Sequence, residues 1–120
     1  MRQDAENPVV VKSFSFALRC VKLYKYLSTT RKEYVLSKQL LRSGTSVGAN
    51  VKEAIRGQSK ADFHAKMCIA LKEISESEYW LELLYQSEYI TASEFTSLYS
   101  DCKELLKMLT SITKTTRNNL

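Results

Sequence analysis

The chain has 120 residues, which is enough for one hydrophobic core but not for two. It contains only 3 glycines and 1 proline, which argues against a turn-rich β fold. The formal net charge of +5 is uneven, because residues 1–72 hold 14 Lys and Arg against 5 Asp and Glu, whereas residues 73–120 hold 4 against 8. We therefore expect a basic side and an acidic side, suited to anionic ligands or to head-to-tail self-association.

We recognise no targeting segment and no cysteine motif in the sequence. The start, MRQDAENP, is polar, and no apolar run approaches the ~18 residues of a membrane span, so we expect a soluble, cytoplasmic protein without a membrane partner. Cys20, Cys68 and Cys102 are far apart and lack CxxC spacing. We interpret them as reduced, mostly packed thiols, and expect neither a disulfide framework nor a zinc site.

The first helix is predicted to begin after Asn7, an N-cap residue followed by Pro8 at the first helical position. Apolar residues with bundle spacing then follow at Val10, Phe14, Ala17, Val21 and Tyr24. A second apolar set flanks this seam, at Phe16, Cys20, Leu23 and Leu27. Because one helix carries two apolar sets, we expect it to face two neighbours.

The second helix is predicted over about 31–56, with Thr30 and Glu33 as a capping box. Helical winding of about 100° per residue places the residues of this helix on distinct faces. The core seam consists of Leu36, Leu40, Ser43, Val47, Val51 and Ala54. The opposite line, which we call the basic line, consists of Lys38, Arg42, Thr45, Ala49, Lys52 and Arg56.

Two flanks of this helix are candidates for a helix–helix contact. Gly44 and Gly48 are one turn apart, so they stack on one face and allow another backbone to approach closely. That helix could belong to the same chain or to a neighbouring subunit, and the spacing leaves the choice open. The other flank holds Ser46, Asn50 and Glu53, which is either a solvated side or an interfacial polar network.

The third and fourth helices are predicted to begin near 60 and 92, after Ser59 with Asp62 and Thr91 with Glu94. Their seams alternate in steps of four and three. The third seam is Phe63, Met67, Ala70, Ile74, Ser77, Leu81 and Leu84, and the fourth is Phe95, Leu98, Cys102, Leu105, Leu109 and Ile112. Beside the third seam lie Ile69, Glu73, Glu76 and Trp80, which form either the edge of the bundle or an interface.

These elements predict an all-α fold, an antiparallel up-down-up-down four-helix bundle with short connections. Residues 1–120 are expected to form this single domain, with 1–7 and 118–120 as loose tails. We expect no enzyme, metal or cofactor, because His64 is the only histidine and no glutamate stands three residues before it, as a di-iron carboxylate site requires.

Seven basic residues are candidates for binding RNA or DNA through phosphates: Lys38, Arg42, Lys52 and Arg56 in the second helix, and Lys12, Arg19 and Lys22 in the first. Charged outer faces are also the ordinary solvated surface of a bundle. Any binding is expected to be salt-sensitive and to read few bases.

The segments QLLRSGTSVGANVKEA and SKADFHAKMCIALKEISESEYWLELL resemble a family of small bacterial four-helix bundle proteins. This family includes proteins encoded in 23S rRNA intervening sequences, sometimes labelled ribosomal. The resemblance covers about residues 12–112 and implies a ring-like homopentamer, which favours an interface at Gly48, Asn50 and Glu53. A related branch, the accessory protein of diversity-generating retroelements, implies contacts with nucleic acid and a reverse transcriptase.

Two functions therefore remain open. The first is a non-enzymatic homo-oligomer with a basic surface for RNA or DNA. The second is a protein-interaction module without affinity for nucleic acid, in which the charge asymmetry serves docking between subunits or to a partner protein. The proposed oligomer contacts are Gly44, Gly48, Ser46, Asn50, Glu53, Ile69, Glu73 and Trp80.

Overall fold

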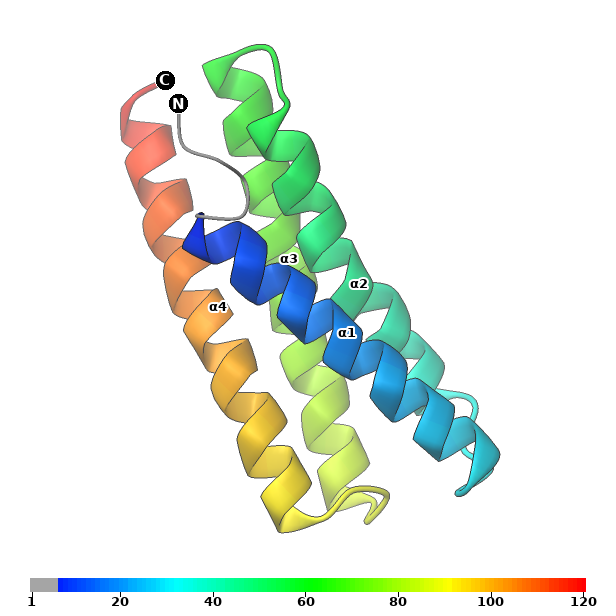
Figure 1. The fold of residues 1–120 in the computed structure, drawn as a ribbon. Helices are drawn as coiled ribbons and strands as arrows, with labels where there is room; N and C mark the ends of the chain where they lie inside the picture. Colours follow the sequence, from blue (N-terminus) through cyan, green and yellow to red (C-terminus); the bar gives the residue numbers. More distant parts are fainter. Residues whose placement is uncertain (1–6) are drawn as a thin grey trace.

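The computed structural model describes residues 7–120, which form the four helices α1 (Pro8–Thr29), α2 (Leu36–Ile55), α3 (Lys60–Gln86) and α4 (Ala92–Asn118). Successive helices run in opposite directions along a body of 45 × 22 × 21 Å, and α1 crosses the others obliquely (Figure 1). The described residues contain no strand. The predicted all-α up-down-up-down bundle is therefore confirmed. Most of the predicted N-terminal tail, residues 1–6, lies outside the described residues, and α4 includes Asn118.

Three of the four predicted helix starts are confirmed by side chains that accept hydrogen bonds from free backbone amides. Asn7 accepts from the second amide of α1 at 3.2 Å, and Ser59 accepts from the Asp62 amide at 3.0 Å. Thr91 and Glu94 form both arms of a capping box, at 2.8 and 3.1 Å. Each cap satisfies amide groups that the first turn of a helix leaves without a carbonyl partner.

The predicted start of α2 near residue 31 is wrong. Thr30 instead closes α1, because its amide donates to the Tyr26 carbonyl, and Lys32 then turns the chain with a φ of 56°. The role of Glu33 also differs from the prediction, because its buried carboxylate accepts three amide hydrogen bonds itself. The donors are the N–H groups of Val35, Leu36 and Ser37, at 3.0, 2.9 and 2.7 Å.

The predicted seams of α2, α3 and α4 form the core. Their buried members are Leu40, Ser43, Val47, Val51 and Ala54 from α2; Met67, Ala70, Ile74, Ser77, Leu81 and Leu84 from α3; and Leu98, Cys102, Leu105 and Leu109 from α4. The residues nearest the helix ends, such as Leu36 and Phe63, are only partly buried. Ser43 and Ser77 share a hydrogen bond of 2.8 Å across the core, so these polar members are satisfied.

The predicted seam of α1 is wrong. The helix buries the set that we placed on its flank, Phe16, Cys20, Leu23 and Leu27, together with Val9 and Ser13, which we had not assigned. The predicted seam, Val10 to Tyr24, is only partly buried, and its member Phe14 is 65% exposed. Both sets have helical spacing, so only the position of α1 against α2 and α4 determines which one enters the core.

Candidate assembly and nucleic-acid surfaces

The basic line of α2 is less positive than its sequence suggests. Arg42 is exposed at the middle of the bundle, where its guanidinium donates to the Glu76 carboxylate and lies 3.6 Å from that of Glu73, both on α3. The hydrogen bond to Glu76 raises the pKa of Arg42. The same contact lowers the pKa of Glu76, whereas burial and the neighbouring Glu76 raise the pKa of Glu73. Arg42 is therefore charged, but its charge is largely compensated within the chain.

Two of the three candidate cations of α1 are compensated by α4. Lys12 forms an ion pair with Glu104 at 2.9 Å, and Arg19 forms one with Asp101 at 2.6 Å. Arg19 also donates to the Ser97 hydroxyl and carbonyl. Such pairs are partly exposed and stabilise a fold by only about 0–1 kcal/mol, but they reduce the positive potential available to phosphates.

Two other candidates, Lys22 and Lys38, are exposed and form no ion pair with any described residue. Lys22 lines a shallow hollow between α1 and α4 together with the exposed ring of Tyr26, and Glu94 of α4 is also part of its lining. A cation beside an exposed aromatic ring suits single-stranded nucleic acid, because the lysine contacts phosphate while the ring stacks on a base.

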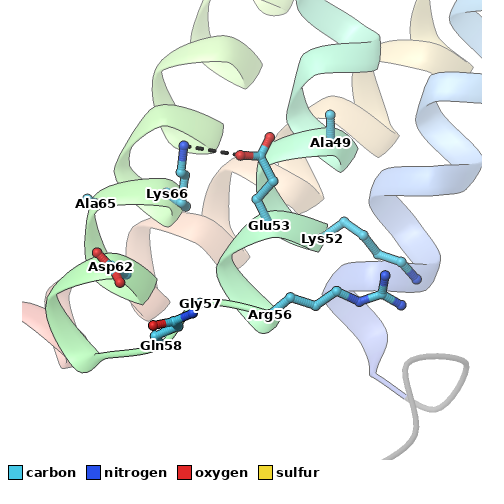
Figure 2. Close-up of a pocket in the computed structure, with 9 residues that line it drawn as sticks. All are labelled: Ala49, Lys52, Glu53, Arg56, Gly57, Gln58, Asp62, Ala65 and Lys66. Atoms are coloured by element: carbon cyan, nitrogen blue, oxygen red, sulfur yellow. Dashed lines mark ion pairs between the residues drawn. The ribbon is translucent and has the colours of Figure 1, made fainter.

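The last two candidates of the basic line, Lys52 and Arg56, lie at the end of α2. Figure 2 shows their side chains extending side by side, away from α3. They belong to the rim of an open pocket of about 650 Å³ whose opposite wall includes Asp62 and Lys66. Across this pocket Lys66 pairs with Glu53 at 3.1 Å (Figure 2). The pocket thus contains both signs of charge and is not a purely cationic site.

The polar flank of α2 is satisfied mainly by its own helix. Ser46 donates to the Arg42 carbonyl at 2.7 Å, and the Asn50 amide donates to the Ser46 carbonyl at 2.8 Å. Glu53 is bound to Lys66 of α3. These contacts fit the solvated-side interpretation, although all three residues keep accessible surface.

The flank of α3 is less well satisfied. Ile69 is exposed, and the Oε1 atom of Glu73 and the Nε1 atom of Trp80 are buried without a hydrogen-bond partner among the described residues. Glu76, one turn before Trp80, is close enough for the indole to help lower its pKa, but the contact does not meet hydrogen-bond geometry. These two atoms have almost no accessible surface, so a group from outside the chain would contact Ile69 and the exposed part of Trp80 on this flank rather than the two atoms themselves.

The two glycines contact α1 of the same chain. A Cβ atom added at Gly44 would lie 2.4 Å from the Cys20 sulfur, and one at Gly48 would lie 3.3 Å from the Ser13 carbonyl oxygen. The helix that the two glycines were predicted to let approach closely is thus α1 of the same chain. Gly44 is buried by this contact and is removed from the candidate oligomer interface; Gly48 is only partly buried.

Sequence analysis did not predict one exposed apolar surface, which we call the α1 stripe: Val10, Val11, Phe14, Ala17, Leu18 and Val21. It had assigned four of these residues, Val10, Phe14, Ala17 and Val21, to the core seam. Phe14 is 65% exposed, and Val11 and Leu18 are each 47% exposed. Much of the stripe, together with Thr45, Gly48 and Ala49 of α2, lines a groove of about 680 Å³. The signal for this surface was the first apolar set of the helix, which sequence analysis had assigned to the core.

Other classes of site find no support in residues 7–120. No group of three or more His, Cys, Asp or Glu side chains is placed to hold a metal ion in this part of the chain. Nor is any described helix long and apolar enough to cross a membrane.

The chain matches one family model and is similar to a solved structure. The family model described as 23S rRNA-intervening sequence protein matches residues 5–111. Among solved structures, the chain is similar to the crystal structure of a protein of unknown function from the S23 ribosomal protein family of Bacteroides thetaiotaomicron VPI-5482, with 56% sequence identity and a TM-score of 0.86. The match covers 88% of this chain and 98% of that chain. No curated protein matches the sequence.

Proposed function

Because the chain belongs to the family of 23S rRNA-intervening sequence proteins, we propose that it is a non-enzymatic assembly protein that functions as a homo-oligomer. The family resemblance suggests a pentamer. The observation that carries the proposal is the α1 stripe, because a helix that exposes Phe14, Val11 and Leu18 together is typical of an interaction surface.

The flank of α3 supplies a second contact for the same assembly. A neighbouring copy would pack against the exposed Ile69 and the partly buried Trp80. Trp80 and Ile69 would contribute apolar area to that contact.

The test is the mass of Phe14→Glu by light scattering. Burying a phenylalanine contributes about 1.5–3 kcal/mol, so placing a carboxylate there should weaken each contact at least about tenfold. We expect wild type to be a multimer and Phe14→Glu to approach the 13.8 kDa of one chain, with its helix content unchanged.

Thr110→Glu is the matched control, because Thr110 is exposed on α4, outside the α1 stripe. It should keep the wild-type mass. A wild-type protein of one chain, or a Phe14→Glu variant that stays multimeric, would contradict self-association through the stripe. In the first case the stripe would be assigned to a different protein partner.

We propose binding of RNA or DNA as a second function, at cations that lie outside the α1 stripe. It is favoured by the exposed cations Lys22 and Lys38, by Tyr26 beside Lys22, and by the net charge of +5. Repetition of these groups around a homo-oligomer would multiply a weak phosphate interaction without any new contact. Such binding would depend on salt and read little sequence.

A further inference from the structure

His64 and Cys68 lie one turn apart on α3, near the end of the bundle where α4 finishes. The Nδ1 atom of His64 is 2.6 Å from the hydroxyl oxygen of Thr116 on α4. Its other ring nitrogen, Nε2, is 3.4 Å from the Cys68 sulfur. The three side chains thus form a continuous series in which a nucleophile contacts a base and a third group orients the base.

The Thr116 hydroxyl has two neighbouring acceptors, the Thr113 carbonyl and Nδ1 of His64, and the one that receives its hydrogen determines the imidazole tautomer. The Thr116 hydroxyl donates its single hydrogen to the Thr113 carbonyl at 3.2 Å. When the hydroxyl makes this donation, its oxygen accepts from His64 and Nδ1 carries the proton. In that tautomer the lone pair of Nε2 is available to accept a proton from the Cys68 thiol.

Cys68 differs from the other two cysteines in its surroundings. Cys68 is exposed, whereas Cys20 and Cys102 are buried. Burial raises the pKa of each of these two thiols to about 12, with a further increase from neighbouring charge, so they remain protonated and unreactive. Cys68 is therefore the thiol that a small reagent can reach in the folded protein.

A metal does not explain the arrangement. Two protein ligands are too few for a structural zinc site, and no third His, Cys, Asp or Glu side chain joins them within residues 7–120. The geometry suits covalent chemistry at sulfur better.

We propose that Cys68 is a modification site for low-molecular-weight disulfides, with His64 as its base and Thr116 as a positioning residue. The Cys68 sulfur attacks one sulfur of the disulfide while its proton passes to Nε2 of His64. The disulfide bond of the reagent breaks, a new bond joins Cys68 to the attacked sulfur, and the departing thiolate takes the proton back from the imidazolium. The products are a mixed disulfide and one free thiol, so no other oxidant is needed.

The first experiment treats the native protein with a chromogenic aromatic disulfide and follows the released thiolate by absorbance. We expect one thiol per chain to react rapidly and the other two only after unfolding in denaturant. Cys68→Ser should abolish the rapid reaction. If the native protein releases no thiolate, or if Cys68→Ser leaves the rapid phase, the assignment is wrong.

The second experiment separates activation by His64 from mere exposure. His64→Gln keeps a polar side chain but removes the base, and it should slow the rapid phase on the order of tenfold or more. Thr116→Val, which removes the orienting oxygen, should slow the reaction severalfold, and Thr116→Ser should retain the wild-type rate. Protection of Cys20 and Cys102 reports that each variant remains folded.

Lys72→Gln is the control for charge, because Lys72 is one turn after Cys68 on α3. It should change the rate less than about twofold, and the same order of variants is expected with an uncharged alkylating agent. A His64→Gln rate equal to wild type, or a Lys72→Gln effect as large as that of His64→Gln, would overturn the role of the histidine.

Discussion

At Gly44 the absence of one carbon atom determines how closely α1 and α2 approach. The hydrogen that replaces a side chain there faces the Cys20 sulfur, with Phe16 also within contact distance of an added Cβ. A glycine inside a helix costs about 0.5–1 kcal/mol relative to alanine. The close packing of the two helices around the glycine compensates for that cost within a single chain.

Gly44→Ala should therefore destabilise the protein although alanine is the better helix former. Overpacking a core costs about 1–3 kcal/mol, so we expect a net loss of about 1 kcal/mol in the free energy of unfolding. The measurement is urea unfolding at a fixed chain concentration, because self-association would add to the apparent stability.

The control for this prediction is the same substitution in a Cys20→Ala background, where the clashing sulfur is absent. The loss caused by Gly44→Ala should shrink or reverse there, giving a coupling between the two positions. Equal losses in both backgrounds would show that the Cys20 sulfur is not what limits the approach.

At the scale of the element, the start of α2 depends on Glu33. Burial by itself raises the pKa of this carboxyl, but the hydrogen bonds from Leu36, Ser37 and Val35 outweigh it and lower the pKa from its ordinary value of 4.5. The charge also lies at the positive end of the helix dipole. The Glu33 carboxylate, which precedes the helix, thus accepts the kind of amide hydrogen bond that an N-cap hydroxyl usually accepts.

Glu33→Gln should reduce the free energy of unfolding at neutral pH by about 1–2 kcal/mol, because the charge is lost from three amide hydrogen bonds. In wild type this contribution is present above the unfolded pKa and disappears as the pH falls through the lower folded pKa. The Gln variant should lack that pH dependence below 4.5. Thermal unfolding across an acidic pH series measures both effects.

Glu82→Gln, at an exposed position on α3, is the reference and should change stability by less than about 0.5 kcal/mol. If the two variants have the same pH profile, Glu33 does not act as the cap of α2.

At the scale of the whole molecule, the basic first half and the acidic second half of the chain neutralise each other in part. Lys12 and Arg19 of α1 pair with α4, and Arg42 of α2 pairs with α3. The bundle therefore presents fewer uncompensated cations than the count of Lys and Arg suggests. The α1 stripe lies beside the basic line, so an apolar and a cationic surface adjoin.

RNA affinity should respond in opposite directions to two double substitutions. Lys22→Glu with Lys38→Glu should weaken binding of a structured RNA and lower the salt slope by about two, whereas Asp101→Asn with Glu104→Gln should strengthen binding by releasing Arg19 and Lys12. Fluorescence anisotropy at about 50 and 200 mM salt measures both. If wild type shows no binding at either salt concentration, the nucleic-acid proposal is wrong and the protein-interaction function is favoured.

Much of the fold could be predicted because its signals are local. Thr91 with Glu94 satisfies amides within one turn, and the seams of α2 to α4 follow from helical spacing alone. The cap of α2 was mispredicted because a local pattern can also occur where no helix begins. Thr30 and Glu33 match a capping box in sequence, but the chain reversal at Lys32 places them on either side of a turn.

The candidate surfaces were harder to predict, because each depends on what lies opposite a residue. Arg42 and Arg19 have the sequence pattern of phosphate ligands, yet carboxylates from distant segments compensate them. The approach of Cys68 and His64 follows from helical spacing, but the Thr116 contact that orients the imidazole joins residues 52 positions apart. Such pairings leave no local pattern.

The sequence by itself determined the four helices and their antiparallel order, because caps and apolar periods act within a few residues. Only the tertiary structure decided which apolar face of α1 enters the core, which helix meets the glycines, and which cations stay uncompensated. Those outcomes depend on how neighbouring helices dock, and docking selects one face where spacing allows two.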